Sequence, residues 1–193
     1  MPRWESDARG RLERAALDLF ETQGFERTSV AQIARAAGLT ERSFYRHFSD
    51  KREVLFADDE LEAHLVGRVE AADPDLAPIE VLLAALETAD EVFRSREFLL
   101  RRVKVIAASP ALAERDLIKL ADLARAMARA LERRGVEPGA ARLVVDVATA
   151  ITRRATSRWL TDPDAVFPEL VRQAAAELNA AVAPLASAER RGG

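Results

Sequence analysis

The sequence has no cysteine and only two histidines, His47 and His64, among its 193 residues. Without thiols it forms neither disulfide bonds nor thiolate metal sites, and two histidines are too few for a histidine-based metal cluster. We therefore expect no metal and no cofactor. The sequence also lacks a nucleophile with a recognisable base partner, which indicates that the protein is not an enzyme. A pocket holding a polar constellation around His64 would reverse this last inference.

Long apolar runs are missing as well. No stretch approaches the roughly 20 apolar residues that a membrane span requires, and the first ten residues carry no signal-peptide pattern. We expect no membrane association and a cytoplasmic location. Glycine and proline number only eight each, against 49% hydrophobic and 32% charged residues. This composition is typical of a folded globular chain of one or two domains.

An excess of positive charge is the third absence. The formal net charge is −3 and the pI is about 5.6, so no general basic field attracts nucleic acid. Any binding of this kind must come from a local patch. Residues 1–56 are the best place for it, because they hold ten basic and nine acidic side chains.

Helical periodicity is what the sequence has in abundance. No segment alternates as a strand does, and the pattern predicts an all-α fold. In the first helix, apolar residues recur at helical spacing and Gly24 follows as a stop. These apolar residues are Leu12, Ala15, Ala16, Leu19 and Phe20.

Two short helices are expected next. Ser29 and Gln32 have capping-box spacing, which predicts a second helix that ends at Gly38. Thr40 suits the N-cap of a third helix that closes at Phe48. A short helix, a turn containing glycine and another short helix, packed on a longer helix, form the helix-turn-helix pattern.

The rest of the chain predicts six further helices. Asp50 and Glu53 repeat the capping-box spacing, which predicts a fourth helix from Lys51 to about Ala71. A break follows over 73–78, because the residue before each proline is pushed out of the α region. The remaining helices are expected near 78–94, 96–108, 110–134, 138–160 and 164–185.

The third helix has two contrasting faces. Successive residues of a helix lie 100° apart, so Phe44 and Phe48 share one side and polar residues share the other. Arginine suits guanine edges and phosphates, and a tyrosine phenol reaches a phosphate oxygen. The alternative is a solvated polar face with no partner. The candidate DNA-binding residues are Thr28, Thr40, Arg42, Ser43, Tyr45, Arg46, His47 and Lys51.

Residues 16–57, ALDLFETQGFERTSVAQIARAAGLTERSFYRHFSDKREVLFA, resemble the DNA-binding domain of the TetR family of bacterial transcriptional regulators. In that family, positions matching Tyr45, His47 and Lys51 hold the DNA backbone, and those matching Arg42 and Ser43 read bases. Many members have a small residue where this sequence has Arg42. The resemblance implies a ligand-released repressor that binds a palindromic double-stranded DNA operator as a homodimer.

The resemblance also implies a larger helical domain for ligand binding and dimerisation. We expect a DNA-binding domain over 1–50, this second domain over 51–186 and a flexible tail over 187–193. A dimer on a palindrome would place its recognition helices about 34–36 Å apart, or a multiple of that distance.

Two apolar stripes in the last two helices favour a four-helix dimer interface. The alternative is that both stripes face the core of their own chain. The candidate interface residues are Val147, Ile151, Phe167, Leu170, Val171, Ala174 and Leu178.

A small-molecule inducer, apolar or amphipathic, is expected among the helices from about 51 to 134. The candidate pocket residues are Phe93, Phe98, Arg102, Ile106, Leu123 and Met127. Residues 100–117 resemble the corresponding segment of family members that respond to acyl-coenzyme A esters. A different class of function, a helical protein-interaction module whose 40–48 face meets an acidic partner, also stays open.

Overall fold

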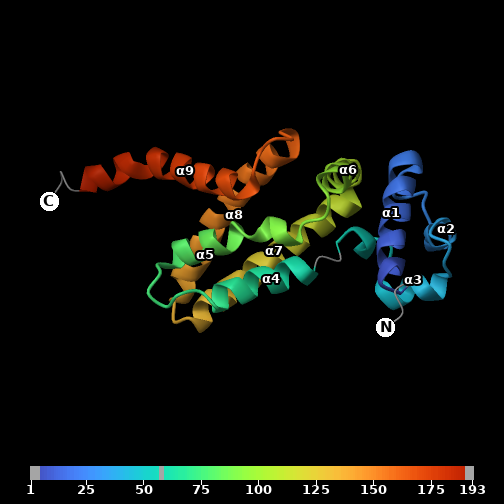
Figure 1. Cartoon of the computed structure of the whole chain (residues 1–193), viewed down its shortest axis with the longest axis horizontal. Coiled ribbons are helices and arrows are strands. Elements are labelled where there is room, and N and C mark those ends of the chain that lie inside the picture. Colours follow the sequence, from blue (N-terminus) through green and yellow to red (C-terminus); the bar gives the residue numbers. More distant parts are fainter. Residues whose placement is uncertain (1–4, 57–58, 190–193) are drawn as a thin grey trace. The chain divides into compact units, whose positions relative to one another are not determined.

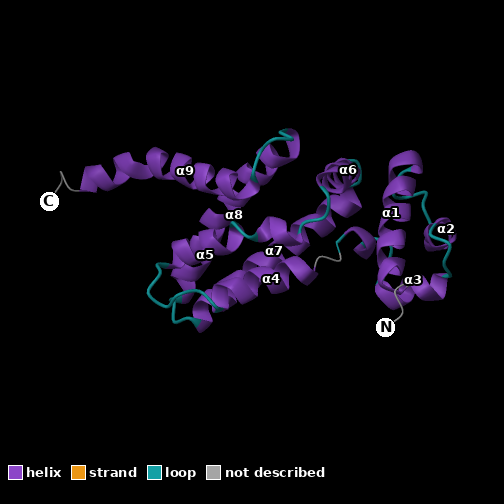
Figure 2. Ribbon diagram, viewed as in Figure 1, coloured by secondary structure: helices purple, strands orange, loops and turns teal. Residues whose placement is uncertain are grey.

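The computed structural model describes residues 5–56 and 59–189, and all regular structure in these ranges is helical (Figures 1 and 2). The predicted all-α fold is confirmed. The α-helices are α1 (Glu5–Gln23), α2 (Val30–Ala36), α3 (Glu41–His47), α4 (Asp59–Glu70), α5 (Pro78–Leu86), α6 (Arg96–Ala107), α7 (Pro110–Arg133), α8 (Pro138–Thr161) and α9 (Phe167–Glu189). Two short 3₁₀ helices, η1 (Glu53–Leu55) and η2 (Ala89–Val92), complete the described structure.

The chain forms two compact units. Unit 1 comprises residues 1–58 and 94–121, and unit 2 comprises residues 59–93 and 122–193. The boundary expected at residue 50 therefore falls inside unit 1, which also takes in α6 and the first half of α7. Of the expected tail, residues 187–189 belong to α9, and residues 190–193 lie outside the described residues.

The turn between α2 and α3 follows from its sequence. Ser29 and Gln32 form the predicted capping box at the start of α2. Gly38 has φ of +66°, in the left-handed region where a side chain is strained. Thr40 then caps α3 by accepting a hydrogen bond from the Ser43 amide at 3.1 Å. Each predicted signal is present at its predicted residue.

The core of unit 1 fixes α3 against α1. Phe44 is fully buried and Phe48 is 3% exposed, and their ring centroids lie 5.3 Å apart. Leu12 and Phe20 of α1 belong to the same apolar cluster, as does Ile33 of α2. The cluster is completed from the other segment of unit 1 by Val105, Ile106 and Leu112.

Ion pairs hold α6 to α1, and a hydrogen bond holds it to η1. Arg101 reaches Glu21 at 2.6 Å and Asp18 at 2.5 Å. These two carboxylates hold the pKa of Arg101 above its ordinary range. The Nε of Arg102 donates to the carbonyl of Leu55 at 2.7 Å. Segments that are distant in sequence are therefore joined by directed polar contacts within unit 1.

The prediction of one fourth helix from Lys51 was wrong. Asp50 does accept hydrogen bonds from the amides of Arg52 and Glu53, as a capping residue should. Burial opposes its ionisation, but the hydrogen bonds from Arg52 and Glu53 outweigh this effect and lower the pKa of Asp50. The cap starts only the three-residue η1, and α4 begins at Asp59. Val54, Leu55 and Phe56 are all buried in the core of unit 1, and their packing there replaces the first turns of the predicted helix.

Unit 2 has its own core, formed by α4, α5, the second half of α7, α8 and α9 (Figure 1). This core corrects the interface predicted from the apolar stripes, because the stripes pack against each other within one chain. Of the seven candidate residues, Val147 and Leu178 are half-buried. The other five, Ile151, Phe167, Leu170, Val171 and Ala174, are at most 5% exposed. These five side chains are unavailable to a partner.

Lys51 ties the end of the helix-turn-helix to the turn after α1. Its Nζ donates to the carbonyl of Phe25 at 2.7 Å and to that of Thr28 at 3.0 Å. The same ammonium group lies 4.1 Å from the centroid of the Phe25 ring. A charged donor that satisfies two carbonyls stabilises this turn.

We predict that Lys51→Met lowers the free energy of unfolding by about 2 kcal/mol, because a hydrogen bond to a charged group contributes roughly 1.5–3 kcal/mol. Lys104→Met is the matched control, since Lys104 is exposed on α6 and has no side-chain partner among the described residues. Urea unfolding followed by circular dichroism measures both variants. If the two variants are equally stable, the hydrogen bonds of Lys51 to the two carbonyls do not stabilise the fold.

Candidate nucleic-acid interface

The outward face of α3 carries the side chains that the sequence singled out. Arg42, Tyr45 and Arg46 are exposed, with Tyr45 at 56%, and Ser43 and His47 are half-buried. Neither Arg42 nor Arg46 makes a side-chain hydrogen bond or ion pair to any described residue. The two guanidinium groups are therefore available to a ligand.

Two neighbouring hydroxyls stand at the start of α3. The Thr40 hydroxyl donates to the Ser43 hydroxyl at 3.2 Å, while Thr40 also accepts from the Ser43 amide. This arrangement uses one lone pair of the Ser43 hydroxyl and leaves the other lone pair and the O–H donor for an external group. Thr40 is exposed beside it. Both residues stabilise the start of α3, and both remain at least partly exposed.

The aromatic residues of α3 lie against its buried side. The Tyr45 ring meets the Phe44 ring edge to face, with centroids 5.5 Å apart. The His47 ring centroid is 6.3 Å from that of Phe48. These contacts with buried rings hold the Tyr45 and His47 side chains in place. Less side-chain entropy is therefore lost when the two residues bind a partner.

Thr28 needs correction as a candidate DNA contact. Its side chain is 2% exposed, and its hydroxyl donates to the Gly24 carbonyl at 2.8 Å and accepts from Gln23 Nε2 at 3.0 Å. Lys51 already uses two of its three donors on the carbonyls of Phe25 and Thr28, so its predicted phosphate contact rests on the third donor and stays a prediction. The structure brings Lys51 into contact with the Thr28 carbonyl, and the other six candidates lie on α3 and at its cap.

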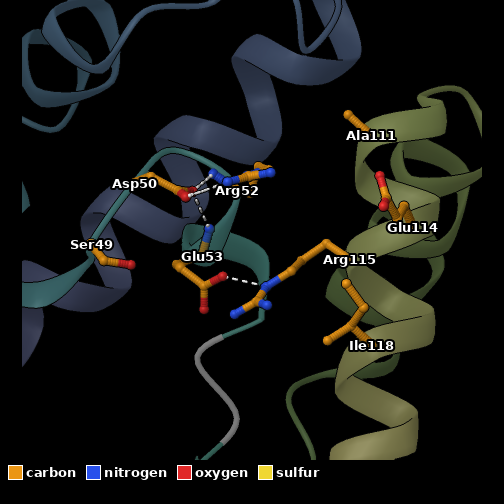
Figure 3. A pocket seen from close by; sticks show the side chains of 8 residues that line it. All are labelled: Ser49, Asp50, Arg52, Glu53, Ala111, Glu114, Arg115 and Ile118. Carbon is orange, nitrogen blue, oxygen red and sulfur yellow. Dashed lines mark hydrogen bonds and ion pairs between the residues drawn. The ribbon is translucent and has the colours of Figure 1, made fainter.

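A depression of about 180 Å³ lies between residues 49–53 and the first turns of α7 (Figure 3). Its charged groups are largely paired with one another. Glu53 lies 2.5 Å from Arg115 and 3.4 Å from Lys119, and Asp50 lies 3.0 Å from Arg52. The hydrogen bond to Glu53 raises the pKa of Arg115. Because these charges neutralise one another, we interpret the depression as a polar contact between two segments of unit 1.

The residues predicted to line one inducer pocket do not share one apolar cluster. Phe98 and Ile106 belong to the core of unit 1, where Arg102 also pairs with Asp116 at 3.1 Å. Phe93, Leu123 and Met127 belong to the core of unit 2. Phe93 packs there with Trp159 and Phe167, at ring-centroid distances of 5.5 and 5.0 Å. Ile106 and Met127 are buried core side chains.

Within residues 5–56 and 59–189, no helix combines the length and the hydrophobicity that a membrane span requires. No group of three or more acidic or histidine side chains has a metal-binding arrangement within these ranges. His64 is half-buried in unit 2, and its Nε2 lies 2.8 Å from the Thr88 hydroxyl.

Curated relatives share parts of this sequence. The HTH-type transcriptional regulator TcmR of Streptomyces glaucescens is 42% identical over 79 residues, which cover 41% of this chain and 28% of TcmR. The candidate mycofactocin biosynthesis transcriptional regulator MftR of Mycobacterium tuberculosis is 30% identical over 127 residues, which cover 64% of this chain and 63% of MftR. The chain thus spans less than two thirds of either relative. Both relatives are named as transcriptional regulators.

A solved structure shares the fold over most of the chain. It is Thermus thermophilus FadR, a TetR-family transcriptional repressor in complex with lauroyl-CoA. The TM-score is 0.52 at 23% sequence identity, and the match covers 86% of this chain and 90% of FadR. At this identity the likeness establishes the fold alone.

Family models match most of the chain. The model described as bacterial regulatory proteins, tetR family, matches residues 13–57, which contain α2, α3 and η1. The model described as the MftR C-terminal domain matches residues 76–183, more than half of the chain. The chain therefore belongs to the TetR family of bacterial regulatory proteins, with a carboxy-terminal domain of the MftR kind.

Proposed function

We propose that the protein is a sequence-specific DNA-binding transcriptional regulator that acts in the cytoplasm as a ligand-released repressor. One observation carries this proposal: Arg42 and Arg46 are exposed, without side-chain partners among the described residues, on a helix whose opposite side is buried in a core. A short helix with such a face fits the major groove of DNA. Membership of a family of bacterial regulatory proteins supports the same function.

The side chains of α3 divide into two roles. Arg42 and Ser43, near the amino end, read base edges, because a guanidinium group pairs with guanine O6 and N7 in a bidentate manner. Tyr45 and His47 contact the DNA backbone and fix the register. Arg46 lies one turn after Arg42 on the same side and serves either role.

The protein binds a palindromic operator as a homodimer in this proposal. With five predicted interface residues in the core, the outward side of α8 and α9 is the surface left for a partner. Leu143 is 65% exposed and Val182 is 43% exposed there, and exposed Ala150, Ala176 and Ala180 allow close approach of helices. This surface replaces the stripe predicted from the sequence.

Selection of bound duplexes from a random pool by the purified protein tests the proposed function. We expect enrichment of a palindrome, because a symmetric dimer reads two equivalent half-sites. Sedimentation of the protein with the enriched duplex should give two chains per duplex. Absence of enrichment at low salt would refute the proposal and would favour the protein-interaction module instead.

Arg42→Ala should lower affinity for the selected operator by roughly 1–3 kcal/mol, the discrimination given by one good bidentate base contact. Repeating the selection with this variant should show relaxed preference at one position in each half-site. Lys104→Ala is the control that keeps the original preference. If Arg42→Ala weakens binding to all sequences equally, Arg42 contacts phosphate and does not read a base.

The inducer in this proposal is an amphipathic acyl-coenzyme A ester. Support comes from exposed apolar side chains within residues 100–117, the segment that resembles acyl-coenzyme A-responsive members, and from Leu120 shortly after it. Val103 is 47% exposed, Leu117 68% and Leu120 51%. Large apolar side chains exposed in this way are typical of ligand or partner sites. The fold match to a lauroyl-CoA complex supports testing this ligand class first.

Lauroyl-CoA should release the protein from its selected operator, whereas coenzyme A without an acyl chain should not. A ligand shifts the equilibrium only by its different affinities for the bound and released conformations. Fluorescence anisotropy of a labelled duplex measures the release. Identical anisotropy with lauroyl-CoA and with coenzyme A would exclude acyl recognition and leave DNA binding untouched.

A further inference from the structure

Most of the basic side chains in the described part of unit 1 have a partner within the chain. Their partners are carboxylates or backbone carbonyls, often from a distant segment. These pairs include Arg9 and Arg94 with Glu13, Arg27 with the Gln23 carbonyl, Lys51 with the Phe25 and Thr28 carbonyls, Arg52 with Asp50, Arg101 with Asp18 and Glu21, Arg102 with Asp116, and Arg115 and Lys119 with Glu53.

Four cations of this part of the chain have no hydrogen bond or ion pair to another described residue. They are Arg35, Arg42, Arg46 and Lys104. Three of the four lie on the helix-turn-helix, and only Arg42 and Arg46 were singled out by the sequence. Arg35 stands on the exposed side of the last turn of α2. It therefore joins the two arginines of α3 as positive charge that the chain itself does not neutralise.

The surroundings of Arg35 are also basic. Its neighbours Ala36 and Ala37 line a depression of about 340 Å³ together with Arg11 and Arg14 of α1. Arg11 Nη1 lies 3.8 Å from the point where a Cβ atom on Gly38 would stand. Asp18 lines the same depression, but it is paired with Arg101. Arg11 and Arg14 of α1, which both interact within the chain, thus lie on one side of the carboxy-terminal end of α2.

This placement suits the backbone of a DNA duplex. A major groove is about 12 Å wide and is bordered by phosphates on both sides, so a helix that precedes the recognition helix lies beside a strand. The planar guanidinium group matches a phosphate with two parallel hydrogen bonds. The floor next to Arg35 is formed by the small side chains of Ala36 and Ala37, which allow close approach.

We propose that Arg35 binds a backbone phosphate of the operator, so that the DNA interface extends from α3 onto the last turn of α2. The proposal rests on the DNA-binding function proposed above and adds a positioning residue to it. A purely structural role is the competing explanation, since a cation in the last turn of a helix interacts favourably with the helix dipole.

The test uses a labelled 30-base-pair duplex of mixed sequence, because phosphate contacts do not require the operator. The dissociation constant is measured between low and moderate salt for the wild-type chain, Arg35→Ala, Arg35→Gln and Arg35→Lys. Lys104→Ala is the matched control, because Lys104 is also an exposed cation of unit 1, lies on α6 and has no side-chain partner among the described residues. Removing one phosphate contact lowers the log–log salt slope by about 0.9.

We expect the slope to fall by about 0.9 for Arg35→Ala and Arg35→Gln, and to stay at the wild-type value for Arg35→Lys and Lys104→Ala. Thermal unfolding within a few degrees of wild type for either neutral variant excludes the structural explanation. A wild-type slope in both folded neutral variants overturns the Arg35 proposal while DNA binding stands. If the wild-type chain binds no duplex even at low salt, the proposed function itself fails.

Discussion

Burial of Phe44 against α1 is the contact on which the arrangement of the candidate interface depends. The side chain is fully buried, and its ring contacts both Phe48 and Tyr45. A seven-residue helix is too short to be stable on its own, so its orientation comes from packing. Once Phe44 and Phe48 face inward, the 100° step of the helix places Arg42 and Arg46 outward. The same two rings therefore determine the core and, by exclusion, the surface that is proposed to meet DNA.

Charge pairing explains how an acidic protein can present a basic surface. Unit 1 uses Asp18, Glu21, Glu53 and Asp116 to neutralise arginines and lysine of α6 and α7. These pairs join segments that are far apart in the sequence, so they hold the unit together while they remove positive charge from that side of it. The helix-turn-helix arginines receive no such partner. The net charge of the chain therefore says little about the local field at α3.

Local signals were reliable where one or two neighbouring residues suffice. The Ser29 cap, the left-handed Gly38 and the Thr40 cap act within a single turn of chain, and each is found where the sequence placed it. The cap at Asp50 is equally real, but the helix that should follow it is only three residues long. Val54 and Phe56 are buried in the core of unit 1 at this point, and a capping pattern cannot predict such tertiary packing.

The all-α fold, the helix-turn-helix and the polar face of α3 were predictable from local pattern, because hydrophobic periodicity and caps are encoded within a few residues. Which apolar stripes face their own core, and which cations are already paired, depends on contacts between distant segments. Phe167 and Val171 were expected to meet a partner, yet they pack inside unit 2. Lys51 was expected to hold phosphate, and two of its three donors already bind carbonyls. A side chain's availability depends on neighbours that are distant in the sequence, and no local pattern specifies them.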